Sequence, residues 1–564
     1  MAPIPVHIKH AGKLSDIQLD PDLPPSVFKD AVYQITGVPV DRMKVMVKGG
    51  VLKDDSSWKK IGPKPGQTFM VIGAAGELPK PPENPVVFLE DLDDAELAEA
   101  LAKPVGLKNL GNTCYMNATV QALRAVPELQ SALTAPALQS ATPLPGALRD
   151  LYANMGKTTD NVTPMSFLTV LRQVNPQFGE MDRRETRGLM LGGYAQQDAE
   201  ECLSFIVQTL RNVPGLTNEG TSLATSAQAD IGSKKFVEQY LMGEMRRELT
   251  CDEAPEEPAS VSTEQVLKIE CNINITTNYM VPGILNSLDQ KLEKNSPSLG
   301  REAVYSQKSR LTRLPTYLIV HMVRFAWRAD TGKKAKIMRK VKFPTELDAV
   351  DFATEELQAK ILPASRKLKE VEKERFERRK IRKRTKNVTT SKAATSSTVE
   401  ATTTAPGPDG DVAMADAGPS SAEQDKGKAT VEGELEDESV YRGREEKELA
   451  ELADPDLKKD IGASQTGLYD LVAIVTHKGA AADAGHYIAF VKKSVFHPVK
   501  GMTSSSDAAT AAAAAVGMDD DDDDWYKFDD DKVSVFPAEK LATLDGGGED
   551  SSAYVLLYRS KPLA

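Results

Sequence analysis

Cysteine is scarce in this chain of 564 residues, and its few thiols are widely spaced. They are Cys114, Cys202, Cys251 and Cys271, and no two of them form a C-x-x-C pair. A structural zinc site of the usual thiolate type is therefore not expected, and we predict neither a metal nor any other cofactor. Such sparse cysteine usage suits a reducing compartment, where a single thiol can stay free for chemistry.

Long apolar runs are also missing. No stretch approaches the roughly 18 apolar residues needed to span a bilayer, and the segment Met1–Lys9 has no apolar centre of the kind found in secretory signals. We therefore expect no membrane partner. The net charge of −12 is concentrated in tracts and argues against general nucleic-acid binding. Hydrophobic residues make up 40% of the chain, which is enough to form the cores of two or three domains.

Residues 1–75 have the pattern of a small α+β unit. Val6 and Ile8 alternate with polar residues, as in a half-buried strand, and Pro24 and Pro25 open a segment with apolar residues at helical spacing. Strand patterns follow at 44–48 and 68–72. This order is similar to ubiquitin and predicts a β-grasp fold. The chain continues past residue 75 without a terminal Gly-Gly, which indicates a permanent ubiquitin-like domain, and the proline-rich residues 76–103 are predicted to be a linker.

One cysteine stands in a position suited to nucleophilic catalysis. Cys114 follows a glycine-punctuated turn and precedes a helix-compatible run, and a thiol at a helix N-terminus is biased toward the reactive thiolate. Far downstream, His486 lies in a strand-like alternation, and carboxylates follow in residues 525–531. The order Cys, His, Asp is compatible with a thiol-hydrolase triad. On spacing alone, a buried structural cysteine and a structural histidine remain the more common alternatives.

The sequence around these residues bears on the choice between a catalytic triad and structural residues. In order along the chain, GLKNLGNTCYMN, YAQQDAEE, AGHYIAFV and WYKFDDDKVS resemble the cysteine, Gln-Asp and histidine boxes of the ubiquitin-specific proteases. The resemblance implies an α+β fold in which residues 104–561 form a papain-like cysteine protease domain with thumb, palm and fingers. Many members of that family hold their fingers with two thiol pairs on zinc. This chain lacks those pairs, so packing alone must hold its fingers.

The resemblance also implies roles for individual residues. Cys114 would attack the carbonyl of ubiquitin's C-terminal glycine, and His486 would take the thiol proton and later protonate the leaving amine. Asp529 matches the family's third triad position, which orients the histidine, and Asp530 matches a second acidic position that assists in some members. Asn109 matches the asparagine whose side-chain amide stabilises the oxyanion.

A second set of residues is predicted to bind the ubiquitin tail. Asp198 and Glu201 are three residues apart, which on a helix places both carboxylates on one face, where they could grip an arginine of the tail. The alternative is an ordinary exposed acidic surface. The other predicted tail-binding residues are Gln197, Gly485, Tyr487 and Phe325; the last two could equally belong to the core.

Two insertions are predicted inside the protease domain, at about residues 387–461 and 504–524. Their composition is too poor in large hydrophobic residues to offset the entropy of ordering, so both are predicted to be disordered. The preceding stretch, 355–386, is highly charged and helix-prone. Its basic run fits a nuclear-import address or an acid-binding patch, although a solvated helix face is the more common explanation.

The whole pattern resembles the proteasome-associated members of this family. It implies a monomer that acts on ubiquitin and polyubiquitin conjugates at the 26S proteasome regulatory particle, in the cytoplasm and nucleus. The ubiquitin-like domain would dock through Met46, Met70 and Ile72, which align with the hydrophobic patch of ubiquitin. Two alternatives remain from the sequence: a non-catalytic ubiquitin receptor or proteasome shuttle, and a hydrolase of a ubiquitin-like modifier.

Overall fold

A computed structural model gives the fold of this chain, which divides into two compact units, Met1–Asp91 and Leu92–Ala564. The residues that the structure describes are 3–48, 50–54, 56–73, 104–134, 143–182, 185–186, 189–190, 193–217, 234–328, 333–395, 436–481, 484–496 and 523–563. Within these ranges no helix is both long and apolar enough to cross a membrane. The second predicted insertion, 504–524, lies outside the described residues except for its last two positions.

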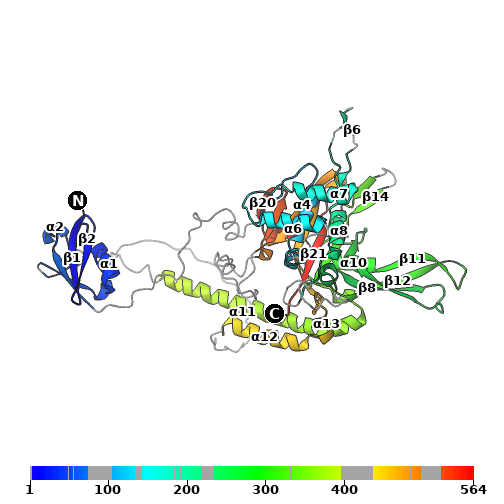
Figure 1. The fold of residues 1–564 in the computed structure, drawn as a ribbon. Coiled ribbons are helices and arrows are strands. Elements are labelled where there is room, and N and C mark those ends of the chain that lie inside the picture. The colour runs from blue at the N-terminus through cyan, green and yellow to red at the C-terminus, as the bar shows by residue number, and fades with distance from the viewer. Residues whose placement is uncertain are drawn as a thin grey trace, which may run out of the picture. The chain divides into compact units, whose positions relative to one another are not determined.

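The first unit is a five-stranded sheet that packs against one main helix (Figure 1). The strand order is β2-β1-β5-β3-β4. Phe28 and Val32 of α1 fill the space over the sheet, and Phe28 meets Trp58 edge to face at 5.5 Å. The β-grasp prediction is confirmed. The elements are β1 (Ile4–His10), β2 (Lys13–Leu19), α1 (Pro25–Thr36), β3 (Lys44–Val47), β4 (Gly50–Val51), α2 (Trp58–Ile61) and β5 (Thr68–Ile72).

The second unit is organised around a mixed sheet whose two faces are both buried. Along β13, Tyr317 and Ile319 face one core while Leu318 and Val320 face the other, as strand alternation requires. The main path of the sheet is β10-β13-β21-β17-β18-β19-β20, with β14, β15 and β16 at its side. The strands are β10 (Lys268–Asn272), β13 (Tyr317–Val323), β14 (Phe325–Arg328), β15 (Lys333–Lys336), β16 (Glu346–Asp348), β17 (Leu468–Ala481), β18 (Ala484–Lys492), β19 (Trp525–Asp529), β20 (Lys532–Phe536) and β21 (Ser552–Ser560).

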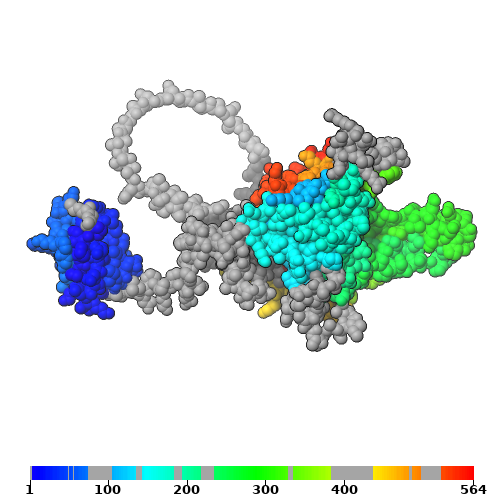
Figure 2. Space-filling model, turned by 45° about the horizontal axis from the view of Figure 1, so that its top comes forward, coloured from blue at the N-terminus to red at the C-terminus, as the bar shows by residue number. Residues whose placement is uncertain are grey.

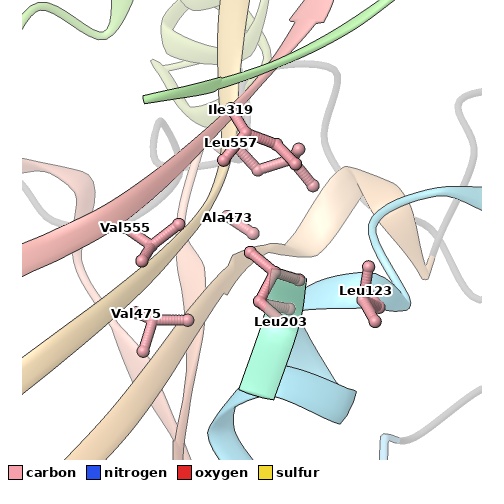
Figure 3. A pocket seen from close by; sticks show the side chains of 8 residues that line it. Leu123, Leu203, Ile319, Ala473, Val475, Val555 and Leu557 are labelled. Carbon is pink, nitrogen blue, oxygen red and sulfur yellow. The ribbon is translucent and has the colours of Figure 1, made fainter. Parts of the chain in front are cut away.

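The thumb is the layer of helices that covers one face of this sheet. Its helices are α4 (Cys114–Leu123), α5 (Pro127–Leu133), α6 (Pro143–Met155), α7 (Met165–Val174), α8 (Ala199–Thr209) and α9 (Phe236–Tyr240), and a short hairpin, β6 (Glu185–Thr186) with β7 (Leu189–Met190), lies between α7 and α8. A cavity of about 10 Å³ lies where Leu123 and Leu203 of these helices meet Val475 and other apolar side chains of the sheet. Figure 3 shows the side chains that line it. A space of that size with no polar partners holds no water. The contact between these helices and the sheet is therefore part of the hydrophobic core.

The fingers are a separate four-stranded sheet that extends away from the palm (Figure 2). Its order is β11-β12-β8-β9, with the bounds β8 (Gly243–Cys251), β9 (Ser260–Val266), β11 (Asp289–Ser296) and β12 (Arg301–Arg313). Cys251 packs in a small cluster with Ala303 and Tyr305, and the Tyr305 hydroxyl donates to Glu257 at 2.6 Å. The described residues contain no His, Cys, Asp and Glu group that could hold a metal ion. Packing and a side-chain hydrogen bond join the strands at this end of the fingers.

The other face of the palm carries α10 (Met280–Leu288), α11 (Glu355–Thr395), α12 (Glu438–Leu452) and α13 (Pro455–Lys459). The predicted disordered insertion at 387–461 is wrong over its last part, because α12 and α13 are folded and packed. Leu449 is completely buried against Leu368 and Leu468. The Asp460 carboxylate pairs with Arg313, a guanidinium that is only 5% exposed. Charge pairing thus orders a segment whose apolar residues are few.

Candidate active site

Cys114 is the first residue of α4, and a tightly bonded turn places it there. Asn112 adopts a left-handed conformation, with φ at 54°, and its side-chain amide donates to the Tyr194 carbonyl at 2.9 Å. The Thr113 hydroxyl accepts from the backbone N–H of Leu110 at 2.9 Å. The Cys114 side chain is 2% exposed. The turn therefore fixes the thiol at the helix N-terminus, as the sequence predicts, but seals it from solvent.

The β17–β18 hairpin brings His486 to the same place. Lys478 of β17 pairs with His486 of β18, and the backbone N–H of the next residue, Tyr487, points at the Cys114 sulfur, 3.5 Å away. The segment between Thr476 and Gly485 is mostly hairpin, because β17 continues to Ala481. Residues 482 and 483 lie outside the described chain.

His486 is paired on its other side with Asp529. The histidine Nε2 lies 2.6 Å from the Asp529 carboxylate, so Nδ1 is the ring nitrogen that remains to face Cys114. The hydrogen bond with Cys114 raises the pKa of His486 to about 9; burial opposes this shift and Asp529 reinforces it. Burial raises the pKa of Asp529, but hydrogen bonds from His486 and Lys527 outweigh it and lower the pKa. The geometry thus places the His486 ring between the Cys114 sulfur and the Asp529 carboxylate.

Asp530 bonds different residues from those that Asp529 bonds. It stands in the turn between β19 and β20 with φ at 54°, and its two carboxylate oxygens accept from the amides of Asn109 and Asn117, each at 2.8 Å. Its backbone carbonyl accepts from the N–H of Leu107 at 3.0 Å. The Asn109 oxygen in turn accepts from the N–H of Gly111 at 2.9 Å. Both ends of the Asn109 amide are therefore held in place, with Asp530 at one of them.

Gln196 is a site residue that the sequence analysis missed. Its side-chain amide donates to the Cys114 sulfur at 3.4 Å and to the Gly485 carbonyl at 3.1 Å, so it bridges the thiol and the hairpin. The neighbouring Gln197, which was predicted to bind substrate, is a buried residue instead, at 8% exposed. The chain is irregular between Ala195 and Asp198. Because no period governs such a segment, the sequence could not indicate which glutamine faces the thiol.

The predicted Asp198–Glu201 pair does not lie together on a helical face. Asp198 precedes α8 as its N-cap: one carboxylate oxygen accepts from the N–H of Glu200 at 2.7 Å, and the other from the Tyr554 hydroxyl at 2.7 Å. Burial raises the pKa of Asp198, and these hydrogen bonds only partly offset it. Glu201 accepts from Gln177 at 2.7 Å, yet its side chain is 42% exposed. Glu201 is therefore the carboxylate that a ligand can reach.

Behind the hairpin lies a cluster of aromatic rings. His477 is completely buried, 4.8 Å from the ring of Tyr487 and 5.0 Å from that of Phe325. Burial lowers the pKa of His477 to about 3, helped by the nearby Lys336 and His486 charges. The ring of Tyr487, predicted to line the tail channel, is 1% exposed and belongs to this core. Phe325 is partly buried against it.

Gly485 is required for close packing between the two strands of the hairpin. A Cβ at this position would clash with the His477 ring and with the Lys478 carbonyl. The glycine therefore lets the two strands approach each other beside His486.

The residues predicted for docking lie on the outer face of the first unit's sheet. Met46 and Met70 are cross-strand partners on β3 and β5, and Ile72 pairs with Lys44 on the same strands. The row extends across the sheet, because Val51 pairs with Met46. Met70 and Ile72 are about half exposed, at 52% and 50%. The three predicted residues thus share one solvent-facing apolar surface.

Comparisons with known proteins agree with this architecture. Residues 105–558 match a family model described as ubiquitin carboxyl-terminal hydrolase, and residues 6–75 match the ubiquitin family. The chain is 40% identical over 562 residues to the Schizosaccharomyces pombe protein named ubiquitin carboxyl-terminal hydrolase 6, with each chain covered completely. It is 36% identical to an Arabidopsis thaliana protein of the same name, covering 99% of this chain and 98% of that one. A Caenorhabditis elegans protein named ubiquitin carboxyl-terminal hydrolase 14 is 26% identical, with 99% and 93% covered.

Proposed function

Because this chain belongs to the ubiquitin carboxyl-terminal hydrolase family and is a cysteine deubiquitinase, we propose that Cys114, His486 and Asp529 carry its chemistry. The observation that supports this most directly is the 2.6 Å contact between His486 and Asp529, beside a hydrogen bond with Cys114 that raises the pKa of His486 to about 9. An imidazolium poised beside a thiol keeps the sulfur in its nucleophilic form.

The reaction proceeds in two halves. The Cys114 thiolate attacks the carbonyl carbon of ubiquitin's terminal glycine, and the tetrahedral intermediate collapses to a thioester as the C–N bond breaks and His486 gives its proton to the leaving amine. A water molecule then loses a proton to His486 and attacks the thioester. That step releases the ubiquitin carboxylate and returns the proton to the Cys114–His486 pair.

We assign Asn109 to the oxyanion and Asp530 to the positioning of Asn109. The Asn109 amide nitrogen carries two hydrogens; one is engaged by Asp530 at 2.8 Å, which leaves the other available for the developing negative charge. Asp530 fixes the direction of that hydrogen in advance, which is what stabilisation of a transition state requires. Asp529 thus acts on the imidazole that moves the proton, and Asp530 acts on the amide that faces the oxyanion.

Access to the thiol must be controlled in this protein. Cys114 is 2% exposed and is contacted by Gln196 and by the N–H of Tyr487. A ubiquitin tail reaches the sulfur only after Gln196 or the β17–β18 hairpin shifts. We propose that the free enzyme is slow for this reason and that docking at the 26S proteasome, through Met46, Met70 and Ile72 of the ubiquitin-like domain, favours the open site. The same proposal places the enzyme in the cytoplasm and nucleus.

The direct test is turnover of a fluorogenic ubiquitin amide. Wild-type protein is expected to release the fluorophore, whereas Cys114→Ala is expected to release none while it binds ubiquitin with wild-type affinity in calorimetry, because the loss of one sulfur leaves the recognition surface intact. Turnover by Cys114→Ala above a few per cent of wild type would show that another group is the nucleophile. Binding without turnover by the wild type, with or without proteasome, would favour a ubiquitin receptor.

A further inference from the structure

Helix α11 carries an exposed stripe on the side away from α12. Arg366, Lys369, Lys373, Phe376 and Lys380 recur at spacings of three and four residues, which places them along one face of the helix. All five are exposed, and Phe376 is 63% exposed. We call these five residues the outer stripe. It has one cation in nearly every turn and a single aromatic ring at its centre.

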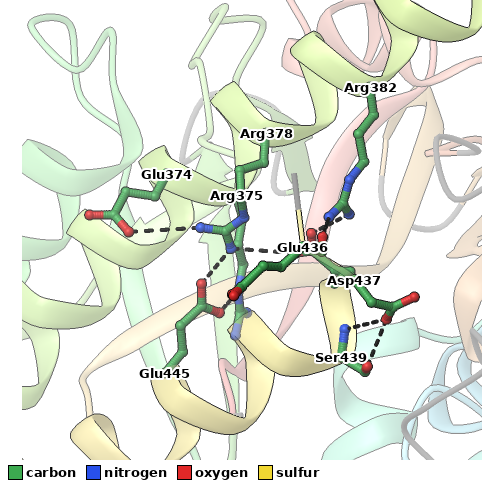
Figure 4. Close-up of polar contacts among 9 residues, drawn as sticks. Glu374, Arg375, Arg378, Arg382, Glu436, Asp437, Ser439 and Glu445 are labelled. Atoms are coloured by element: carbon green, nitrogen blue, oxygen red, sulfur yellow. Dashed lines mark hydrogen bonds and ion pairs between the residues drawn. The ribbon is translucent and has the colours of Figure 1, made fainter. Parts of the chain in front are cut away.

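The opposite face of α11 shows how this helix binds acidic partners. Arg375 donates to Glu445 at 2.7 Å, and Arg378 bonds the same carboxylate (Figure 4). Arg382 pairs with Glu438 nearer the start of α12, and Lys367 pairs with Glu448 at 2.8 Å nearer its end. The two helices therefore run antiparallel, joined by a ladder of ion pairs. Buried Leu449 adds an apolar anchor beside the ladder.

The outer stripe lacks such neutralisation. Among the described residues, Arg366, Lys373 and Lys380 form no ion pair, and only Lys369 has one, with Asp348 at 2.6 Å. Like charges one turn apart repel each other, and an exposed phenylalanine contributes little to folding. Two exposed glutamates, Glu370 and Glu377, lie three or four residues from stripe cations, but within the described part of the chain neither forms an ion pair with them. The stripe therefore brings the isolated chain no evident stabilisation.

We propose that the outer stripe is a docking surface for an acidic helix of a partner protein. Cations that recur once per helical turn, about 5.4 Å apart, match carboxylates with the same repeat on a facing helix. Phe376 would supply the apolar anchor at the centre, in the way that Leu449 does on the inner face. Nucleic acid fits less well, because the chain carries a net charge of −12 and would repel an extended polyphosphate.

The test uses the full chain and a designed probe. A fluorescein-labelled helical peptide, with glutamate repeating every three to four residues and one central leucine, is titrated by fluorescence anisotropy at low and physiological salt. A scrambled peptide of equal composition and a duplex DNA serve as competing ligands. The stripe variant is Lys373→Glu with Lys380→Glu. The matched control is Lys447→Glu with Lys459→Glu, which changes the net charge equally at exposed lysines outside the stripe.

The expected result is saturable binding of the helical peptide that weakens about tenfold in the stripe variant and less than twofold in the control. Phe376→Ala should weaken it several-fold at both salt concentrations, because an apolar contact is not screened. Hydrolysis of a ubiquitin amide should be the same for all variants, which shows that they are folded. Equal binding of the scrambled peptide, equal weakening in the control, or no saturable binding would overturn the proposal. Tighter binding of DNA, lost in the stripe variant, would replace it with a nucleic-acid site.

Discussion

At the scale of single residues, two adjacent aspartates have separate roles in the site. The Asp529 carboxylate pairs with the imidazole and with Lys527, whereas Asp530 bonds two asparagine amides and the Leu107 backbone. The turn between β19 and β20 makes this possible, because the left-handed conformation of Asp530 sends its side chain to a different partner from its neighbour's. We therefore predict that removal of each carboxylate changes catalysis in a different way.

Asp529→Asn is expected to lower kcat/KM by roughly 10²–10⁴-fold, because the imidazole loses the anion that orients it. It should also move the alkaline limb of the pH profile. Asp529 helps to raise the pKa of His486 to about 9, so its loss lowers that pKa, and the protonated ring disappears at lower pH than in the wild type. The pH dependence of hydrolysis of a fluorogenic ubiquitin amide measures both effects.

Asp530→Ala is the matched comparison. It should lower kcat roughly tenfold to a hundredfold through misplacement of Asn109, with a smaller shift of the alkaline limb than Asp529→Asn, since its charge is a minor influence on His486. If Asp530→Ala gave the larger pH shift, the two assignments would have to be exchanged.

Substitution of Asp198 and substitution of Glu201 should also have different effects, the first on stability and the second on substrate binding. Asp198→Ala removes the cap of α8 and leaves the Tyr554 hydroxyl unpaired, so we expect it to lower the free energy of unfolding by about 1–3 kcal/mol. Glu201→Gln should leave stability nearly unchanged but raise KM for ubiquitin substrates. Denaturant unfolding and steady-state kinetics on both variants decide this, and an unchanged KM in Glu201→Gln would remove Glu201 from the tail-binding set.

At the scale of elements, α12 and α13 belong to the folded domain. Deletion of residues 436–460 exposes the face of α11 that Leu449 covers and strips Arg313 of its Asp460 partner. A buried guanidinium without its partner alone costs about 3–5 kcal/mol, so the midpoint of urea unfolding should fall clearly. Deletion of residues 396–435 removes none of the residues that make these contacts and serves as the control. Equal midpoints for the two deletions would show that α12 adds nothing to the fold.

The same elements show what a sequence can indicate. The strand at Tyr317–Val323 and the helix after Cys114 were predictable because hydrophobic period and glycine punctuation specify them locally. Helix α12 was missed because ion pairs with α11, rather than an apolar stripe, hold it, and such pairing is a property of two distant segments. The cap at Asp198 left a signal, an aspartate followed three residues later by Glu201, that also fits an exposed acidic face. The contacts of Gln196 and Asp530 depend wholly on tertiary structure.

At the scale of the whole molecule, the ubiquitin-like domain is predicted to govern the protease domain through its partner. Hydrolysis of a fluorogenic ubiquitin substrate by the full chain should rise several-fold when purified proteasome is added. Residues 92–564, which form a compact unit of their own, should respond much less. Met46→Ala combined with Met70→Ala should reduce the response of the full chain without changing its basal rate. Equal rates in all mixtures would show that docking does not regulate the site.

The central claim is that Cys114 is the nucleophile that receives ubiquitin. Incubation of the full chain with ubiquitin bearing a C-terminal electrophile, followed by intact mass measurement and peptide mapping, tests this most directly. The account predicts one ubiquitin adduct per chain, located on Cys114 and absent in Cys114→Ala, with much slower formation in His486→Ala. An adduct on Cys202, Cys251 or Cys271, or the same adduct in Cys114→Ala, would contradict it.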